Sequence, residues 1–327
     1  MELRVRLFCE KLGQRVPFLA GRRGLVLALF VLVVAILSWF ALGPAGGASV
    51  RLKSPEQLHS YFIEQGYTMQ ALRAGNAEVP PVFITTVPED WARDLDVKQK
   101  KSLFFRTLLP LVLQVNKDIR ADRTRLGELR KRIASGQVLA ADERKWLRAL
   151  AERYKVIDPD KADAKSPLSP DQLASLGARV DIVPPSLALA QGAIESAYAL
   201  SRFAVEGNAL FGQWTYGKGM KPGEQREDLG DYRVRSFKTP IASVRGYALN
   251  LNTNPAYRPF RAMRSAARKA GQVPRGTVLV EGLKAYSERG EAYIEEVRGV
   301  IRVNGLGGTD IARLEDGSPI ELRTGLF

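Results

Sequence analysis

The feature that most limits the fold of this chain is an uninterrupted apolar segment near its N-terminus, at residues 24–42. Its nineteen residues carry no charge, which is close to the length that a helix needs to cross a bilayer. Basic residues dominate residues 1–23, so the positive-inside rule predicts that this part is cytoplasmic. A signal peptide cleaved within residues 44–49 is the alternative. Both interpretations place the rest of the chain outside the cytoplasm.

The chain contains one cysteine, Cys9, and one histidine, His59. Disulfide frameworks, cysteine-rich zinc clusters and multi-histidine metal centres each need more of these residues, so the sequence predicts no metal site and no cofactor. A Ser-His-Asp or Cys-His mechanism would have to use His59 or Cys9. Acid–base chemistry is therefore expected to depend mainly on carboxylates.

The chain is basic, with 49 lysines and arginines against 35 aspartates and glutamates and a net charge of +14. Most of this excess follows the apolar segment, in the part predicted to be exported. A basic surface outside the membrane suits anionic lipid headgroups or an acidic cell-wall polymer. The predicted topology argues against nucleic acid as a partner.

Residues 49–157 are predicted to form a helical accessory region, joined to the rest by a proline-rich linker at residues 158–170. Periodicity and capping residues indicate helices at 55–66, 97–135 and 141–154 and a strand at 81–87. The first half of the long helix is apolar almost all round and should be buried, with a bend at Pro110. The arginines of its second half indicate a solvated face.

Residues 171–304 read as a second, mostly helical domain with a small β element, so the predicted fold class is α+β, mostly α. Helices are expected after Pro184-Pro185 and at residues 240–251 and 283–303, with a strand at 232–237. The helix at 283–303 is expected to complete the core, with no chemical role. The C-terminal tail, residues 305–327, could be strand or disorder.

Glu195 is the carboxylate that we expect to carry the chemistry. It lies on a helix that has no other charge between Asp181 and Arg202. An apolar setting in a cleft would raise the pKa of this carboxyl by desolvation, so that it stays protonated and can donate a proton. A glycosidic oxygen needs such a general acid. The competing interpretation is a solvated surface residue.

Three spaced motifs carry a resemblance to a known family. VPPSLALAQGAIES surrounds Glu195, NALFG follows at residues 208–212, and GYALNLNTNPAYRPFR begins at Gly246. Together with PPVFITTVPED and KKSLFFRTLLPLVLQVN, they resemble the glucosaminidase domain family of peptidoglycan hydrolases, in particular the membrane-anchored bacterial Bax proteins. The resemblance covers about residues 80–264.

This resemblance implies a lysozyme-like α+β domain with a small β-hairpin, in which Glu195 is the general acid near the end of a helix that lines the cleft. It implies cleavage of the β-1,4 bond after N-acetylglucosamine in peptidoglycan strands. Ala209 departs from the family's turn, where a second asparagine is usual. The candidates for contact with the glycan are Asn208, Phe211, Trp214 and Tyr216. A turn that packs Phe211 into the core, and a buried Trp214, are the structural alternatives.

Two further residues are candidates for the reaction itself. Tyr247 matches the family's helix tyrosine that points into the cleft, although it could instead pack between helices. Glu227 is chosen by position as the second carboxylate, from a segment that also holds Glu224, Asp228 and Asp231. If none of these acids reaches the sugar, the acetamido group of the substrate could act as the nucleophile.

The resemblance and the apolar segment together predict a single-pass protein of the bacterial inner membrane, anchored by residues 24–42, with its catalytic domain in the periplasm. The alternative is secretion into the periplasm after signal cleavage. Peptidoglycan strands are the expected partner, and the sequence identifies no protein partner. A lytic transglycosylase and a non-catalytic peptidoglycan-binding scaffold are the other functions compatible with these motifs.

Overall fold

The computed structural model describes residues 49–52, 54–75, 78–89, 91, 94–160, 166–223 and 230–324. These described residues form one compact unit. The predicted membrane segment at residues 24–42 and its cytoplasmic flank lie outside the described residues. Within the described ranges, no helix is both long and apolar enough to cross a membrane.

Two short helices begin the described part of the chain. They are α3 (Pro55–Glu64) and α4 (Met69–Ala74). The Ser54 hydroxyl caps α3 by accepting a hydrogen bond from the Gln57 amide at 3.3 Å, with proline at the first helical position. Gly66 follows the helix with a φ of +66°, a conformation that glycine adopts without strain. The predicted helix that ends at Gly66 is confirmed.

The small sheets join the two ends of the described chain. Strands β1 (Ser49–Leu52) and β3 (Val82–Ile84) both pair in parallel with β7 (Ile320–Thr324), which lies between them. Strands β2 (Glu78–Val79) and β6 (Arg313–Leu314) also pair in parallel. The tail is thus strand in part, and the accessory region and the C-terminal tail complete one another's sheets.

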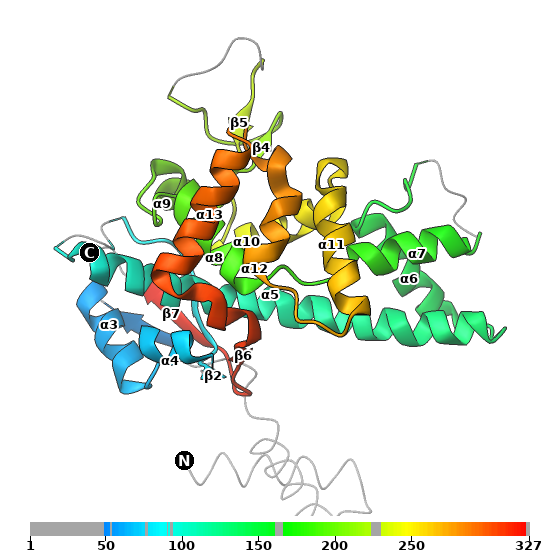
Figure 1. Cartoon of the computed structure of the whole chain (residues 1–327), viewed down its shortest axis with the longest axis horizontal. Helices are drawn as coiled ribbons and strands as arrows, with labels where there is room; N and C mark the ends of the chain where they lie inside the picture. The colour runs from blue at the N-terminus through cyan, green and yellow to red at the C-terminus, as the bar shows by residue number, and fades with distance from the viewer. Residues whose placement is uncertain are drawn as a thin grey trace, which may run out of the picture. The chain divides into compact units, whose positions relative to one another are not determined.

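The 38-residue helix α5 (Val97–Ala134) is the central support of the fold. Figure 1 shows it as a long ribbon that runs beneath α8, α10 and α11. Asp96 and Gln99 form a reciprocal capping box at its start. Its first half is buried and includes Pro110. The predicted long helix, with its buried first half, is confirmed.

The arginines of the second half of α5 do not form a purely solvated face. Arg123 donates hydrogen bonds to the carbonyls of Gly177 and Val180, each at 2.8 Å. The Arg125 guanidinium lies 4.3 Å from the Trp146 ring centroid. These contacts hold α6 and α7 against α5, because a long arginine side chain can bury its stem and still satisfy its charged head. The prediction of a solvated face is therefore wrong for Arg123, which is half-buried, whereas Arg125 is exposed as predicted.

The remaining helices and short 3-10 turns build the second half of the unit. They are α6 (Ala141–Arg153), α7 (Pro170–Arg179), α8 (Pro185–Glu195), α9 (Arg202–Gly207), α10 (Pro240–Thr253), η3 (Pro255–Tyr257), α11 (Arg258–Lys269), α12 (Gly276–Leu279), η4 (Val280–Tyr286), α13 (Glu291–Asn304) and η5 (Leu306–Ile311). An antiparallel pair, β4 (Trp214–Thr215) and β5 (Arg233–Val234), lies between α9 and α10 in the sequence. The mostly helical class with small sheets is confirmed, and its likeness to lysozyme stays a prediction.

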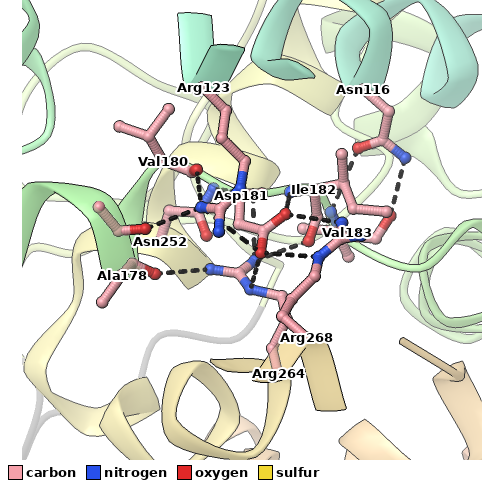
Figure 2. A network of polar contacts seen from close by, with 11 residues as sticks. Asn116, Arg123, Ala178, Val180, Asp181, Ile182, Val183, Asn252, Arg264 and Arg268 are labelled. Atoms are coloured by element: carbon pink, nitrogen blue, oxygen red, sulfur yellow. Dashed lines mark hydrogen bonds and ion pairs between the residues drawn. The ribbon is translucent and has the colours of Figure 1, made fainter. Parts of the chain in front are cut away.

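A buried network around Asp181 fixes the segment that leads into α8. Figure 2 shows the Asp181 carboxylate facing Arg123, Arg264 and Arg268. Arg268 donates to it at 2.9 and 3.2 Å, and the buried Arg264 lies 3.8 Å away. Burial would raise the pKa of Asp181, but the three arginines outweigh it and hold this pKa below its ordinary value. The network ties α5 and α11 to the start of α8.

Candidate active site

Helix α8 is buried over almost its whole length and ends at Glu195. Gly192 allows its close approach to α5, because a β-carbon there would lie 2.8 Å from the Leu108 side chain. The chain then turns sharply through Ala197, Tyr198 and Ala199, which all have positive φ values. Ser196 stabilises this turn by donating to the Gly192 carbonyl and accepting from the Ala199 amide. The predicted helix is confirmed, but it stops at Glu195, before Tyr198.

Glu195 is half-buried at the wall of a cleft of about 1140 Å³. The cleft is lined by residues of α10, of the turn after α9 and of the segment before α13. Among the described residues, its charged lining consists of Lys155, Glu195, Arg235, Arg245, Glu288 and Arg289. The cleft is therefore open to solvent and carries more positive than negative charge.

The environment of Glu195 favours its protonated form. Burial raises the pKa of this carboxyl above its ordinary value, although the hydrogen bond from Tyr293 opposes the effect. The charge of Glu296 raises the pKa further and that of Arg289 lowers it. The position at the C-terminal end of α8 acts in the same direction as burial, because the helix dipole disfavours negative charge there. A carboxyl with a raised pKa keeps its proton to a higher pH than an ordinary glutamate does, and it can act as an acid there.

Glu195 is the end of a chain of buried hydrogen bonds. The Tyr247 hydroxyl donates to Gln191 Oε1 at 2.6 Å. Gln191 Nε2 donates to the Tyr293 hydroxyl at 2.9 Å, and that hydroxyl donates to Glu195 Oε1 at 2.8 Å. Three helices, α8, α10 and α13, thus meet at the carboxylate.

Tyr247 was expected to point its phenol into the cleft. In the structure its side chain is 1% exposed, and its hydroxyl reaches Glu195 only through Gln191 and Tyr293. Phe211, which lines the cleft, stacks on the Tyr247 ring with centroids 3.9 Å apart. The alternative of a tyrosine packed between helices is therefore the one that describes its position, because the aromatic stack covers it.

The Asn208–Gly212 turn has mainly structural contacts. Asn208 adopts the left-handed conformation, and its side chain accepts from the Val87 amide and donates to the Phe237 carbonyl, both at 3.1 Å. Ala209 and Phe211 are buried. Gly212 has a φ of +54° and lies next to the carboxyl, since a β-carbon on it would be 3.4 Å from Glu195 Oε2. The turn ties the accessory region to the cleft and leaves space beside the acid.

We expect Gly212→Ala to lower glycan cleavage at least tenfold, because the added methyl group would occupy the space beside Glu195 Oε2. Its positive φ should also cost about 1 kcal/mol of unfolding free energy. Gly66→Ala is the matched control: its φ is +66°, and a β-carbon there would have no neighbour within 4 Å. Activity assays and denaturant unfolding compare the two, and equal activities would contradict the expectation.

The two exposed aromatic candidates differ in position. Trp214 is 53% exposed, lines the cleft and packs at 4.6 Å against Tyr232. This matches the prediction of a ring available for stacking rather than a core tryptophan. Tyr216 is 76% exposed and does not belong to the described residues that line the cleft.

The predicted second carboxylate, Glu227, lies outside the described residues, as do Glu224 and Asp228. Asp231 is described and pairs at the surface with Arg233 at 3.1 Å. Glu288, which the sequence did not single out, lines the cleft with Glu195. It belongs to the segment between η4 and α13, where Gly290 with a φ of +52° divides the helix expected at 283–303.

The sequence analysis did not single out Gln191 or Tyr293, the two residues that link Tyr247 to Glu195. Gln191 stands four residues before Glu195, so the two share a helix face, and this spacing is a signal that the sequence offered. Tyr293 is 98 residues away from Glu195 in the chain. It lies in the core, as expected for the helix at residues 283–303, and its hydrogen bond to Glu195 is a contact that the sequence did not indicate.

Comparison with known proteins relates this chain to a family of glycosidases. Residues 171–306 match the glucosaminidase family, described as mannosyl-glycoprotein endo-beta-N-acetylglucosaminidase. Protein bax of Escherichia coli (strain K12) is 36% identical over 195 residues, which are 59% of this chain and 66% of that protein. The chain thus spans just under two thirds of the length of this relative. No solved structure matches the chain significantly. The resemblance seen in the sequence motifs is confirmed.

Proposed function

We propose that the protein cleaves the β-1,4 bond after N-acetylglucosamine in peptidoglycan strands, with Glu195 as the general acid. Residues 171–306 match the glucosaminidase family, which implies glycoside hydrolase activity. The observation that carries the proposal is the position of Glu195. Its carboxyl lies in the wall of an open cleft, and its pKa is raised by burial. A protonated carboxyl in such a place can transfer its proton to the glycosidic oxygen as the bond breaks.

The lining of the cleft supports an anionic glycan as the substrate. Arg235, Arg245 and Arg289 lie along it, and Trp214 offers an exposed ring. Peptidoglycan strands carry carboxylates on their stem peptides, which basic side chains would attract. The exposed tryptophan ring suits the apolar face of a sugar.

Three groups are candidates for the nucleophile or base that acts at the anomeric carbon. Glu288 lines the cleft, Glu227 belongs to the segment expected at the β-hairpin, and the acetamido group belongs to the substrate. A retaining mechanism with an enzyme nucleophile needs carboxyl groups about 5–5.5 Å apart, and an inverting one about 6.5–9.5 Å. If single Glu288→Gln and Glu227→Gln variants both keep full activity, the substrate-assisted mechanism is favoured.

The proposed place of action is the periplasm of a bacterium, with residues 24–42 as the anchor in the inner membrane. The uncharged length of this segment and the basic residues before it support this placement. Cell fractionation with protease protection of intact spheroplasts would test it. The described unit should be digested from the outside, and its protection would contradict the proposed topology.

The reaction is tested by mass spectrometry of the sugars released from purified peptidoglycan. We expect fragments with reducing N-acetylglucosamine ends, because hydrolysis adds water at the cleaved bond. Anhydro ends would instead identify a lytic transglycosylase, in which the substrate cyclises internally. Binding of peptidoglycan without release of any fragment would identify a scaffold and overturn the enzymatic proposal.

A further inference from the structure

The geometry points to Tyr293 and Gln191 as positioning residues that fix the acidic proton of Glu195 on its Oε2 atom, the oxygen nearest Gly212 and the cleft. This inference rests on the proposed function, since it explains how the proposed acid is aimed. It adds two residues that touch neither the glycan nor the reacting atoms, and it replaces the expected direct role of Tyr247 with an indirect one.

The hydrogen bonds that link Tyr247, Gln191, Tyr293 and Glu195 all run in one direction. A tyrosine hydroxyl has one proton, and Gln191 can accept from Tyr247 only through its carbonyl oxygen, Oε1. The amide nitrogen of Gln191 must then donate to the Tyr293 oxygen. The proton of Tyr293 consequently points at Glu195 Oε1. Each donor in this series of hydrogen bonds therefore points to the next residue on the way to the Glu195 carboxyl.

This direction decides which oxygen of Glu195 carries the proton. If Oε1 held it, that proton would face the Tyr293 hydroxyl, and the proton of Tyr293 would lose its acceptor inside the protein. An unpaired buried donor is unfavourable, so the protonated carboxyl keeps Oε1 as the acceptor and Oε2 as the acid. Oε2 is the oxygen that lies 3.4 Å from where a Gly212 β-carbon would be, and Gly212 lines the cleft. The acidic proton therefore faces the place where a glycan would bind.

Packing holds the hydrogen-bonded side chains rigid. Gln191, Tyr247 and Tyr293 are all buried. Tyr247 stacks on Phe211, and Tyr293 stacks on Tyr286 with centroids 5.6 Å apart. Side chains so enclosed cannot change rotamer without disturbing their neighbours. The carboxyl of Glu195, itself only half-buried, thus acquires a fixed orientation from a fixed donor.

The titratable groups that face Glu195 come from each element packed around it. Glu296 and Tyr293 belong to α13, and Arg289 precedes that helix. Tyr286 belongs to η4, Tyr257 to η3 and Tyr247 to α10, and each has its pKa raised by its own burial and by the charge of Glu195. The tyrosines stay neutral at the pH of the assay. Among the described residues, Tyr293 is the one of these groups whose hydroxyl donates a hydrogen bond to the carboxyl.

The test is the pH profile of glycan cleavage by the full-length Tyr293→Phe variant. Its hydroxyl favours the ionised carboxylate, so its removal should raise the pKa of Glu195 further. Because a general acid works in its protonated form, the alkaline limb of kcat/KM should move about one pH unit upward. We expect kcat to fall about tenfold with KM little changed, since the proton is no longer held on Oε2.

Two more variants test whether the effect weakens with distance from Glu195. Gln191→Met removes both hydrogen bonds of the amide, and Tyr247→Phe removes the donor farthest from Glu195. The upward shift of the alkaline limb should therefore be largest in Tyr293→Phe, smaller in Gln191→Met and smallest in Tyr247→Phe. Tyr67→Phe is the control: Tyr67 is buried and donates to the Arg106 carbonyl at 3.1 Å, away from the cleft. It should lose similar stability and leave the pH profile unchanged.

An unshifted alkaline limb in both Tyr293→Phe and Gln191→Met would overturn the inference, whatever their activities, because a purely structural role changes the rate without changing the titration. If Tyr293→Phe does not fold, the other two variants decide by the same criterion. The proposed function fails separately: Glu195→Gln would then cleave peptidoglycan like the wild type.

Discussion

Glu195→Gln is expected to lower the rate of glycan cleavage by about 10²- to 10⁴-fold, the contribution usual for a general acid. The glutamine side chain has nearly the same shape and can still accept the hydrogen bond from Tyr293. It has no acidic proton to transfer to the glycosidic oxygen. The measurement is the release of sugar ends from purified peptidoglycan by the full-length protein.

Binding and folding should survive this substitution, which separates loss of chemistry from loss of structure. Sedimentation of the variant with peptidoglycan is expected to match that of the wild type, and its thermal unfolding should change little, because glutamine keeps the shape of the side chain and the hydrogen bond from Tyr293. Glu64→Gln, on the exposed face of α3, is a control for the substitution itself and should retain full activity. Cleavage by Glu195→Gln at the wild-type rate would remove Glu195 from the mechanism.

The pH dependence of the wild type follows from the same carboxyl. Burial raises the pKa of Glu195, and the protonated form is the active one. Activity should therefore persist to a higher pH than an ordinary glutamate would allow, and should fall as the pH rises through the raised pKa. An alkaline limb centred near the pKa of a free glutamate would contradict this account.

Asp181→Asn is expected to reduce the free energy of unfolding by about 3–5 kcal/mol, the loss usual when one partner of a buried ion pair is removed. The Asp181 side chain is 3% exposed, and the Arg264 side chain beside it is 1% exposed. The neutral amide would leave the arginines without a compensating charge. Denaturant unfolding of the full-length protein at neutral pH measures the change.

The control for this prediction is Asp316→Asn. Asp316 pairs with Lys117 at 3.2 Å, but their side chains are 100% and 54% exposed, so this pair should contribute little to stability. The two variants lose the same charge, and their difference isolates the effect of burial. Equal losses of stability would show that the Asp181 network is not the support that its geometry indicates.

The Asp181 network also has a signature in the pH dependence of stability. The three arginines hold the pKa of Asp181 below its ordinary value, so its contribution is present above about pH 4 and is lost as the pH falls through the lowered pKa. The Asp181→Asn variant has no carboxylate at this position, so its stability lacks this pH-dependent contribution. The difference in unfolding free energy between wild type and variant should therefore narrow in acid.

The sequence by itself determined the local structure and the central residue of the site. The capping box at Asp96, the proline entries to the helices and the glycine at position 66 each fixed an element, because these effects depend on residues close together in the chain. Glu195 was identifiable since it is a lone charge in an apolar helix. The spacing of Gln191, four residues before it, was also readable.

Only the tertiary structure decided what surrounds that carboxyl. Tyr293 reaches Glu195 across 98 residues, Phe211 covers Tyr247, and the C-terminal strand β7 inserts between β1 and β3. No local pattern encodes such contacts, because they arise where separate elements pack together. The arginines of α5 show the same limit: their charge predicted exposure, and the packing of α7 beside them turned Arg123 inward.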